Sequence, residues 1–350
     1  MSEAPEPESA AAAKPQEWQL YVWLDKAGEP RSIHTRGERA PEGEYSNLSQ
    51  YSLLPVESDI SGYPPRGDAL FFAEPFRVYR NPIPSMQGTF LLCHIVDSSG
   101  DGQYQEAMVA REALATSDGR PYPYEHLATL AITQQFYLTS KFVPISFATN
   151  PPKMPGPFGS GVGGDLAVGR ATVHKAAAWL RALGVPITTL TPLATPSHWG
   201  ITLEIDTSVV SEDAADQVML LRFLVAKACE ESNLTPAFIT KLLIDPWPSS
   251  LLKITARTRT DSKDPIALGK RLQGGHESLM RAVSHVPGAA VGGGPVDLEV
   301  APYQWAQNAK AGVIVTPDPV GCTWLVDSRI PSSANPYVAF HEWTNSWIQG

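Results

Sequence analysis

The stretch WQLYVWL at residues 18–24 is followed by the sequence DKAGEP at residues 25–30. Aromatic and β-branched side chains dominate the first stretch, and these residue types favour β-strands. Glycine and proline in the second stretch are typical of tight turns. A second strand through Ile33 would then pair with the first. The sequence therefore predicts a β-hairpin at the start of the fold.

Two further apolar stretches, at residues 69–73 and 89–96, have the length and composition of strands. Together with the hairpin they predict a small β domain over residues 17–100. Residues 1–16 consist mostly of alanine, proline and glutamate without apolar periodicity. Such a composition cannot bury enough apolar surface to fold. We therefore expect a disordered tail over residues 1–16.

Residues 101–350 show a different pattern, in which helical and strand-like periods alternate. The predicted helices and strands follow one another at residues 105–115 (helix), 130–138 (strand), 170–183 (helix), 199–205 (strand), 211–231 (helix), 250–258 (strand) and 264–284 (helix). The chain is therefore expected to be an α+β protein, with a small N-terminal β domain and a larger C-terminal domain.

Composition narrows the classes of function. The chain has 350 residues, of which 43% are apolar, and its formal net charge is -9. That charge argues against nucleic acid or an anionic membrane as a partner, because both require clustered lysine and arginine. The chain has no run of 18 apolar residues and no basic leader followed by an apolar stretch. A small-molecule substrate and a cytoplasmic location are expected.

Several separated motifs occur in a defined order along the chain. They are YVWLD at residues 21–25, PGP at 155–157, GVGGD at 161–165, PSHW at 196–199 and SANPY at 333–337. In this order they resemble motifs of the glutamine synthetase family, in particular its eukaryotic type, over about residues 18–348. The resemblance implies an N-terminal β-grasp domain and a C-terminal catalytic-type domain, whose antiparallel sheet is flanked by helices. It also implies a ring-type homo-oligomer, with a decamer as one option.

The metal-binding positions of that family carry other residue types in this chain. Compared motif by motif, they fall on Thr133, Gln135, Leu193, Gly200, Lys253 and Asp327. Only Asp327 offers a carboxylate, whereas divalent cations in such sites require several oxygen ligands. The family's phosphate-binding arginines are also missing from the corresponding residues 308–315. We therefore expect no metal, no ATP or other cofactor, and no ATP-dependent ligation of ammonia.

Alternation along the strands predicts a new polar face in place of the metal site. If the family's register holds, the face carries three residues from each of three strands and two from the end of a fourth: Thr133, Gln135 and Tyr137; Gly200, Thr202 and Glu204; Lys253, Thr255 and Arg257; and Asp327 and Arg329. The candidate catalytic residues are Lys253, Glu204 and Asp327. The candidate substrate-binding residues are Gln135, Tyr137, Thr133, His198, Thr202, Arg257 and Arg329.

Two hypotheses account for this face. In the first, Lys253 is a structural counter-ion that pairs with Glu204 or Asp327. In the second, the charged residues perform general acid/base chemistry on an organic substrate, assisted by Tyr137 or His198. His198 also fits a packing or capping role.

Two classes of function remain open for the chain. Acid/base chemistry on this face fits an enzyme recruited to an isomerisation, cyclisation or condensation of a small metabolite, in specialised metabolism. A counter-ion role for Lys253 fits a catalytically dead protein that acts as a scaffold, ligand sensor or regulator.

Overall fold

The computed structural model describes most of the chain. The described residues are 16–25, 28–38, 48, 51–57, 70–98, 106–115, 127–141, 143–147, 159–205, 211–240, 242, 249–258, 270, 272–284, 305–306, 313–317 and 323–349. The tail predicted over residues 1–16 lies outside this part, except for Gln16, which begins the first strand.

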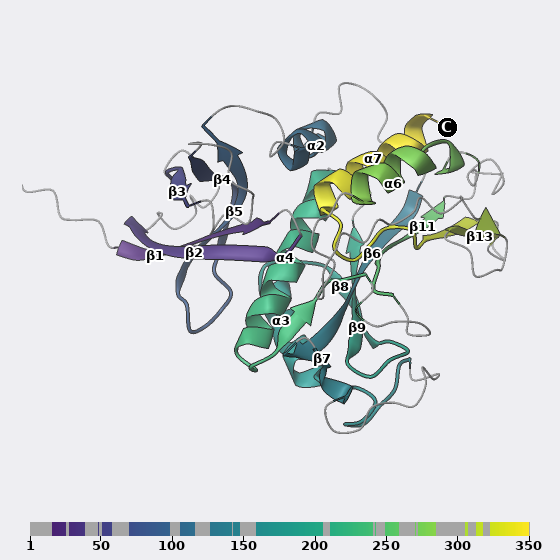
Figure 1. The fold of residues 1–350 in the computed structure, drawn as a ribbon, viewed down its shortest axis with the longest axis horizontal. Coiled ribbons are helices and arrows are strands. Elements are labelled where there is room, and N and C mark those ends of the chain that lie inside the picture. The colour runs from purple at the N-terminus through teal and green to yellow at the C-terminus, as the bar shows by residue number, and fades with distance from the viewer. Residues whose placement is uncertain are drawn as a thin grey trace, which may run out of the picture.

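The N-terminal part forms a five-stranded sheet in the order β2-β1-β5-β4-β3 (Figure 1). Its strands are β1 (Gln16–Leu24), β2 (Pro30–Glu38), β3 (Leu54–Val56), β4 (Phe71–Arg80) and β5 (Gly88–Asp97). Strands β1 and β2 pair antiparallel in full register, so the predicted hairpin is confirmed. Strand β5 then pairs parallel with β1 and antiparallel with β4.

The second sheet has nine strands, and β6 (Leu127–Ser140) lies near its centre. The order along the main path is β12-β13-β14-β11-β6-β9-β8, while β7 and β10 pair with the far end of β6. The other strands are β7 (Val143–Pro144), β8 (Ile187–Pro192), β9 (His198–Ile205), β10 (Thr235–Ala237), β11 (Leu252–Thr258), β12 (Trp305–Ala306), β13 (Val313–Pro317) and β14 (Thr323–Asp327).

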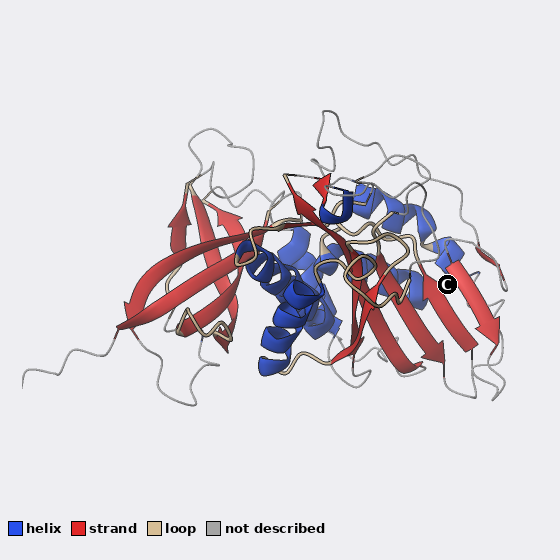
Figure 2. Ribbon diagram, turned by 90° about the horizontal axis from the view of Figure 1, so that it is seen from below, coloured by secondary structure: helices blue, strands red, loops and turns tan. Residues whose placement is uncertain are grey.

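Helices fill the space between the two sheets and cover the upper part of the larger one (Figures 1 and 2). They are α2 (Glu106–Ala115), α3 (Arg170–Ala182), α4 (Ser211–Glu230), α6 (His276–Ser284) and α7 (Pro336–Gln349), with a short 3-10 turn, η3 (Ile145–Phe147). The α+β class is therefore confirmed. In the described residues, no helix is both long and apolar enough to cross a lipid bilayer.

The larger sheet has two unequal faces, as the alternation of burial along β6 shows. Leu130, Ile132 and Gln134 are buried on the face that is turned toward α4. Thr133 and Gln135 on the opposite face are only partly buried. Strand β11 alternates in the same way, with Lys253 on the partly exposed side. We call this partly exposed side of β11, β6 and β9 the open face.

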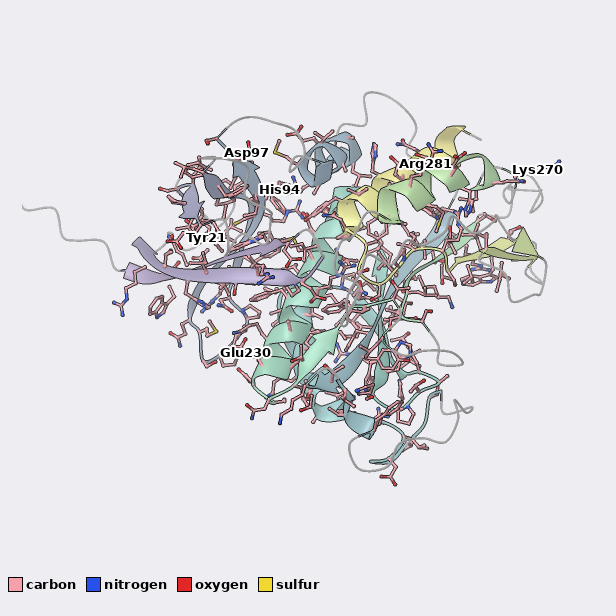
Figure 3. The ribbon with its side chains drawn as sticks, in the orientation of Figure 1. Tyr21, His94, Asp97, Glu230, Lys270 and Arg281 are labelled. Carbon is pink, nitrogen blue, oxygen red and sulfur yellow. The ribbon has the colours of Figure 1, made fainter. Side chains whose placement is uncertain are left out.

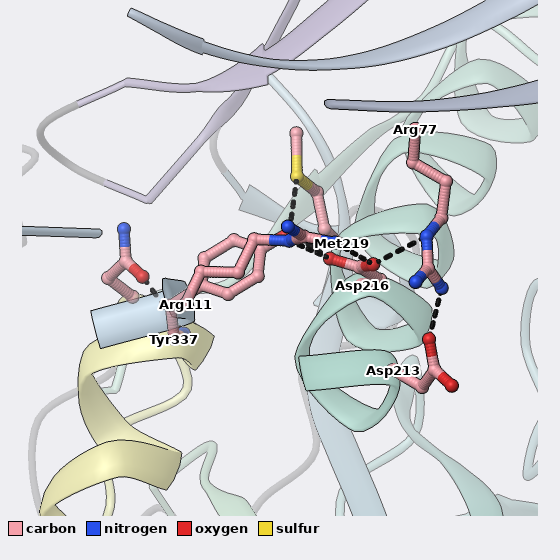
Figure 4. A network of polar contacts seen from close by, with 7 residues as sticks. Arg77, Arg111, Asp213, Asp216, Met219 and Tyr337 are labelled. Carbon is pink, nitrogen blue, oxygen red and sulfur yellow. Dashed lines mark hydrogen bonds and ion pairs between the residues drawn. The ribbon is translucent and has the colours of Figure 1, made fainter. Parts of the chain in front are cut away.

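A buried carboxylate joins the N-terminal sheet to helices α2, α4 and α7 (Figure 4). Asp216 on α4 accepts hydrogen bonds or ion pairs from Arg77 on β4 at 3.0 Å, from Arg111 on α2 at 3.3 Å and from the Tyr337 hydroxyl on α7 at 2.7 Å. Arg77 also pairs with Asp213. We call these residues the Asp216 cluster.

The tip of the β1–β2 hairpin reaches the segment that precedes α7. Gly28 has φ of 77°, and a Cβ atom at this position would lie 2.1 Å from the carbonyl oxygen of Ser333. Only glycine combines that backbone conformation with so close an approach. The Gly28 carbonyl also accepts a hydrogen bond from the buried Arg222 at 3.4 Å. The hairpin turn is therefore fixed by the C-terminal part of the chain.

Glu29 at this turn should make stability depend on pH. Burial, followed by repulsion from Asp25, raises the pKa of Glu29 from 4.5 to about 7, although Arg222 and Arg31 act in the opposite direction. The folded protein therefore holds a proton that the unfolded chain releases, so stability should fall as pH rises from about 4.5 to about 7. We expect Glu29→Gln to reduce this fall by about 1 to 2 kcal/mol in urea unfolding. Equal pH profiles for the variant and the wild type would contradict this.

Candidate functional site

The central row of the open face runs across three neighbouring strands. Thr133 on β6 lies directly opposite Thr202 on β9 on one side and opposite Lys253 on β11 on the other. Directly opposed residues in an antiparallel sheet point to the same side. The two threonine hydroxyl oxygens are 2.9 Å apart and form a hydrogen bond. The structure thus brings together three of the residues that the sequence singled out.

Gln135 and Gly200 form the next row of the open face. The side-chain oxygen of Gln135 accepts a hydrogen bond from the Leu251 N–H group at 3.0 Å. The amide is therefore held by the backbone just before β11. A Cβ atom placed on Gly200 would lie 3.1 Å from the Thr133 methyl group and 3.7 Å from a Leu193 methyl group. Small and apolar groups therefore pack together where the family resemblance places metal-binding acids.

The charged residues of the open face lie on its two outer strands. Glu204 on β9 is exposed and lies one row away from Thr133, opposite Ala131. Lys253 and Arg257 lie on β11, and the Arg257 guanidinium is 5.6 Å from the centre of the Trp324 ring on β14. Within the described part of the chain, Lys253 forms an ion pair neither with Glu204 nor with Asp327. The counter-ion hypothesis is therefore wrong for those two partners.

Tyr137 and His198 lie at the end of the same pair of strands but are buried. Their rings stack with centroids 4.0 Å apart and an angle of 9° between planes. His198 is 2% exposed, and its Nε2 atom is 2.9 Å from the Ser250 hydroxyl. Burial lowers the pKa of His198 to about 3 and raises the pKa of Tyr137 to about 12. At neutral pH both side chains are uncharged, and their contacts are those of a packed wall.

Asp327 and Arg329 do not share the open face, contrary to the prediction. Asp327 lies opposite Ile254 across β11 and β14, and Ile254 is fully buried. The Asp327 carboxylate is bound by the Arg329 guanidinium at 2.6 Å and by the Trp343 indole N–H at 3.2 Å. Arg329 also contacts His276. The pair therefore belongs to the packing between the sheet and helices α6 and α7.

The residues beneath the open face were not identified from the sequence. Gln134 is buried between Thr133 and Gln135 along β6, and its side-chain oxygen accepts a hydrogen bond from Arg222 Nε at 2.9 Å. Its amide nitrogen donates to Ser332, whose hydroxyl in turn donates to the Gln135 carbonyl at 2.5 Å. One pattern could have revealed this network. Arg222 is a lone cation within the apolar run VMLLRFLV of α4, and buried cations require partners.

Comparison with known proteins relates the chain to plant enzymes. It is 23% identical to glutamine synthetase cytosolic isozyme 1-3 of Arabidopsis thaliana over 333 residues, which cover 91% of this chain and 90% of that protein. It is 19% identical to the glutamine synthetase cytosolic isozyme of Medicago sativa over 338 residues, with the same two coverages. A third match, at 20% identity, is glutamine synthetase cytosolic isozyme 1-1 of Arabidopsis thaliana, covering 75% of this chain and 70% of that protein.

No family model matches the chain. The similarity to these enzymes is weak in identity but extends over nearly the whole length of both sequences. It supports a glutamine-synthetase-like relationship, which is what the ordered motifs of the sequence indicate.

Proposed function

We propose that this glutamine-synthetase-like protein uses its open face to bind a small metabolite and to transfer protons on it without metal or ATP. One observation carries the proposal. Lys253 and Glu204, which have opposite charges, lie on the same face and form no ion pair with each other. They stand on β11 and β9, on either side of β6, and strands two places apart are separated by about 10 Å. A small molecule can lie between the two groups.

The donor groups of the open face do not fit a divalent cation. Glu204 is its only carboxylate among the described residues, and its other uncharged polar groups include the hydroxyls of Thr129, Thr133, Thr202 and Thr255 and the Gln135 amide. Magnesium and calcium require several carboxylate or carbonyl oxygens. The Lys253 ammonium group in the same row would repel a cation. We therefore assign no reaction step to a metal.

The proposed chemistry is a proton transfer next to a carbonyl or carboxylate group. Glu204 takes a proton from the substrate carbon, and the electron pair moves onto the neighbouring oxygen. Lys253 stabilises that oxyanion, while the Thr133 and Thr202 hydroxyls orient the substrate. Return of the proton from Glu204 to an adjacent atom completes an isomerisation. A cyclisation or condensation would use the same proton acceptor.

The other candidate residues take supporting roles in this proposal. Arg257, beside the exposed Trp324, anchors an anionic group of the substrate. Gln135 offers its amide N–H₂ group, because its oxygen is already bound. Tyr137 and His198 form a wall behind the site. Asp327 and Arg329 lie outside it, since their side chains face the helices.

Replacement of Lys253 tests the proposed function. A panel of carboxylate- and ketone-bearing metabolites is incubated with the protein, with and without EDTA, and products are followed by mass spectrometry. We expect turnover that EDTA does not affect, and a loss of about 100-fold in Lys253→Ala, in line with the lower range for removing a group that stabilises an oxyanion. Lys270→Ala is the matched control, because Lys270 is exposed and lies away from the open face (Figure 3).

Two outcomes would overturn the proposal. Turnover abolished by EDTA would show that a metal takes part in the reaction. Equal turnover by Lys253→Ala and the wild type would remove Lys253 from the mechanism.

A second candidate function, as a scaffold or ligand sensor without catalysis, is favoured by the packing at Gly200. Methyl groups of Thr133 and Leu193 lie close to this position and take up space on the open face. A sensor would bind a metabolite from the panel without converting it. A rise in melting temperature without product formation would therefore favour this function over catalysis.

The wider expectations for the chain remain proposals as well. We propose that residues 17–100 form a β-grasp domain and residues 101–350 a catalytic-type domain, supported by the separation of the two sheets along the sequence. A ring-type homo-oligomer follows from the family resemblance. The names of the plant relatives place those proteins in the cytosol, and we propose the same compartment here.

A further inference from the structure

A groove separate from the open face lies between three helices of the C-terminal part. Helix α7 lies between α2 and α6 in the view of Figure 1, and residues of all three helices line a cavity of about 710 Å³. Binding sites for small organic molecules usually have volumes of about 300 to 1,000 Å³. The groove is therefore large enough for a metabolite.

The groove has an apolar part that could hold the body of a ligand. Its apolar lining comes from Val109 and Ala110 on α2, Ala282 on α6 and Val338 on α7. Val109 is 54% exposed, although it is one of the large apolar side chains of the molecule. Covering such a side chain with an apolar group removes its surface from water and favours binding.

The charged groups of the groove leave one carboxylate available. Arg281, labelled in Figure 3, is already paired with Glu277 one turn earlier on α6. Glu342 on α7 accepts a hydrogen bond from the Ser278 hydroxyl and has the His341 ring 3.5 Å away. The charges of Arg281 and Glu277 balance each other, so the carboxylate of Glu342 is not balanced by a lysine or arginine among the groove residues. A cationic ligand group is therefore favoured near Glu342.

We propose that this groove is a binding site for a small amphiphilic amine. The apolar body of the ligand would cover Val109 and Val338, and its ammonium group would pair with the Glu342 carboxylate. Glu342 is 20% exposed, so such a pair would be partly desolvated and stronger than one on the open surface. The proposal concerns other residues than those of the open face and does not depend on the function proposed for that face.

The test uses phenethylamine as the probe, with 2-phenylethanol and 3-phenylpropanoate as neutral and anionic molecules of similar shape. Binding to the full chain is followed by NMR of labelled valine methyl groups. We expect the amine to shift the Val109 and Val338 signals and to bind about tenfold more tightly than either comparison molecule, because a hydrogen bond to a charged group contributes about 1.5 kcal/mol or more.

Three variants separate this groove from other acidic positions. Glu342→Gln keeps the size of the side chain and should weaken amine binding about tenfold. Two variants are matched controls and should bind the amine as the wild type does. They are Glu231→Gln, at an exposed glutamate that pairs with Lys175, and Glu204→Gln on the open face. Unchanged melting temperatures would show that all three variants are folded.

Three binding results would overturn the proposal, in addition to a complete absence of binding. These are equal binding of the alcohol and the amine, undiminished binding by Glu342→Gln, and loss of binding in Glu204→Gln, which would place the amine on the open face. Absence of any shift up to the solubility limit of the amine would overturn it as well.

Discussion

Replacing Asp216 with asparagine is expected to lower the free energy of unfolding by about 3 to 5 kcal/mol, the cost of removing one partner from a buried ion pair. Asp216 is fully buried. It forms ion pairs with Arg77 and Arg111 and accepts a hydrogen bond from the Tyr337 hydroxyl. Burial disfavours the charged form of Arg77, but the interactions with Asp216, Tyr79 and Asp213 together outweigh it and raise the pKa of Arg77. Asparagine would remove the attraction to Asp216 while both guanidinium groups stay in place.

The prediction can be checked by urea unfolding monitored with circular dichroism. Glu230→Gln is the matched control, because Glu230 is exposed and pairs with Lys227 at the end of α4 (Figure 3). Exposed pairs of this kind contribute at most about 1 kcal/mol. A loss below about 1 kcal/mol in Asp216→Asn would show that the cluster is not a main support of the fold.

Arg77 and Arg111 reach Asp216 from opposite sides of the boundary between the N-terminal sheet and the C-terminal helices. Arg77 comes from β4 of the N-terminal sheet, whereas Arg111 and Tyr337 come from helices of the C-terminal part. We therefore expect the Asp216 variant to weaken the attachment of the N-terminal sheet first. Unfolding curves recorded by tryptophan fluorescence and by circular dichroism would then no longer coincide, as they do in a two-state transition.

Replacing Arg222 with methionine is expected to lower the free energy of unfolding by about 3 kcal/mol or more. Methionine resembles the apolar stem of arginine, so little volume is lost, but four buried acceptors lose a hydrogen bond from the guanidinium group. They are the Gln134 side-chain oxygen at 2.9 Å, the carbonyl oxygens of Ser332 and Ala334 at 2.8 Å and the Gly28 carbonyl oxygen at 3.4 Å. The Ser332 carbonyl keeps a second donor, the Gln134 amide at 3.2 Å. Each buried acceptor without a partner costs about 1 to 3 kcal/mol.

The matched control is Arg181→Met, which removes an exposed arginine from the last turn of α3. It should change stability by less than about 0.5 kcal/mol. Arg222→Lys should retain only part of the stability that Arg222→Met loses. A lysine cannot direct three N–H groups to acceptors that lie in one plane. Full stability in Arg222→Lys would contradict the role assigned to the planar guanidinium group.

Arg222 also links the hairpin to the open face. Gln134, which it binds, lies between Thr133 and Gln135 on β6, and the Gly28 carbonyl at the hairpin tip contacts the same guanidinium. If the open face performs the proposed reaction, Arg222→Met should also lower its activity. That effect would act through the position of the strand, because Arg222 itself lies on the other side of the sheet.

Much of the secondary structure could be predicted from the sequence, but the element boundaries could not. Residues 130–138 were expected to form a strand, whereas β6 extends over Leu127–Ser140. The residues of β6 beyond the predicted range pair with β7, β10 and β11. Strand β7 follows β6 after a turn, whereas β10 and β11 are distant from it in the sequence. The predicted helix at 264–284 is divided in the described residues: residues 270 and 272–274 are helical, a turn follows at Gly275, and α6 begins at His276. Pairing and packing partners therefore set the ends of these elements.

The family motifs and the period of two determined which residues could share a face. Thr133, Thr202 and Lys253 were named from the sequence alone, and the structure places them in one row. Asp327 was expected on the same face. The face of the sheet on which a side chain lies depends on the residue opposite it in the neighbouring strand. The pairing of Asp327 with the buried Ile254 turns its carboxylate toward Trp343 and the helices.

The sequence by itself determined the α+β class, the N-terminal hairpin and the residue types at Thr133, Gln135, Gly200 and Lys253, none of which is a carboxylate. These properties depend on local propensity, periodicity and residue chemistry. Only the tertiary structure decided that Asp327 packs against Arg329, that Arg222 supports the open face from behind, and that Asp216 joins the N-terminal sheet to helices α2 and α7. These properties depend on the register between strands and on burial, which bring together groups that are far apart along the chain.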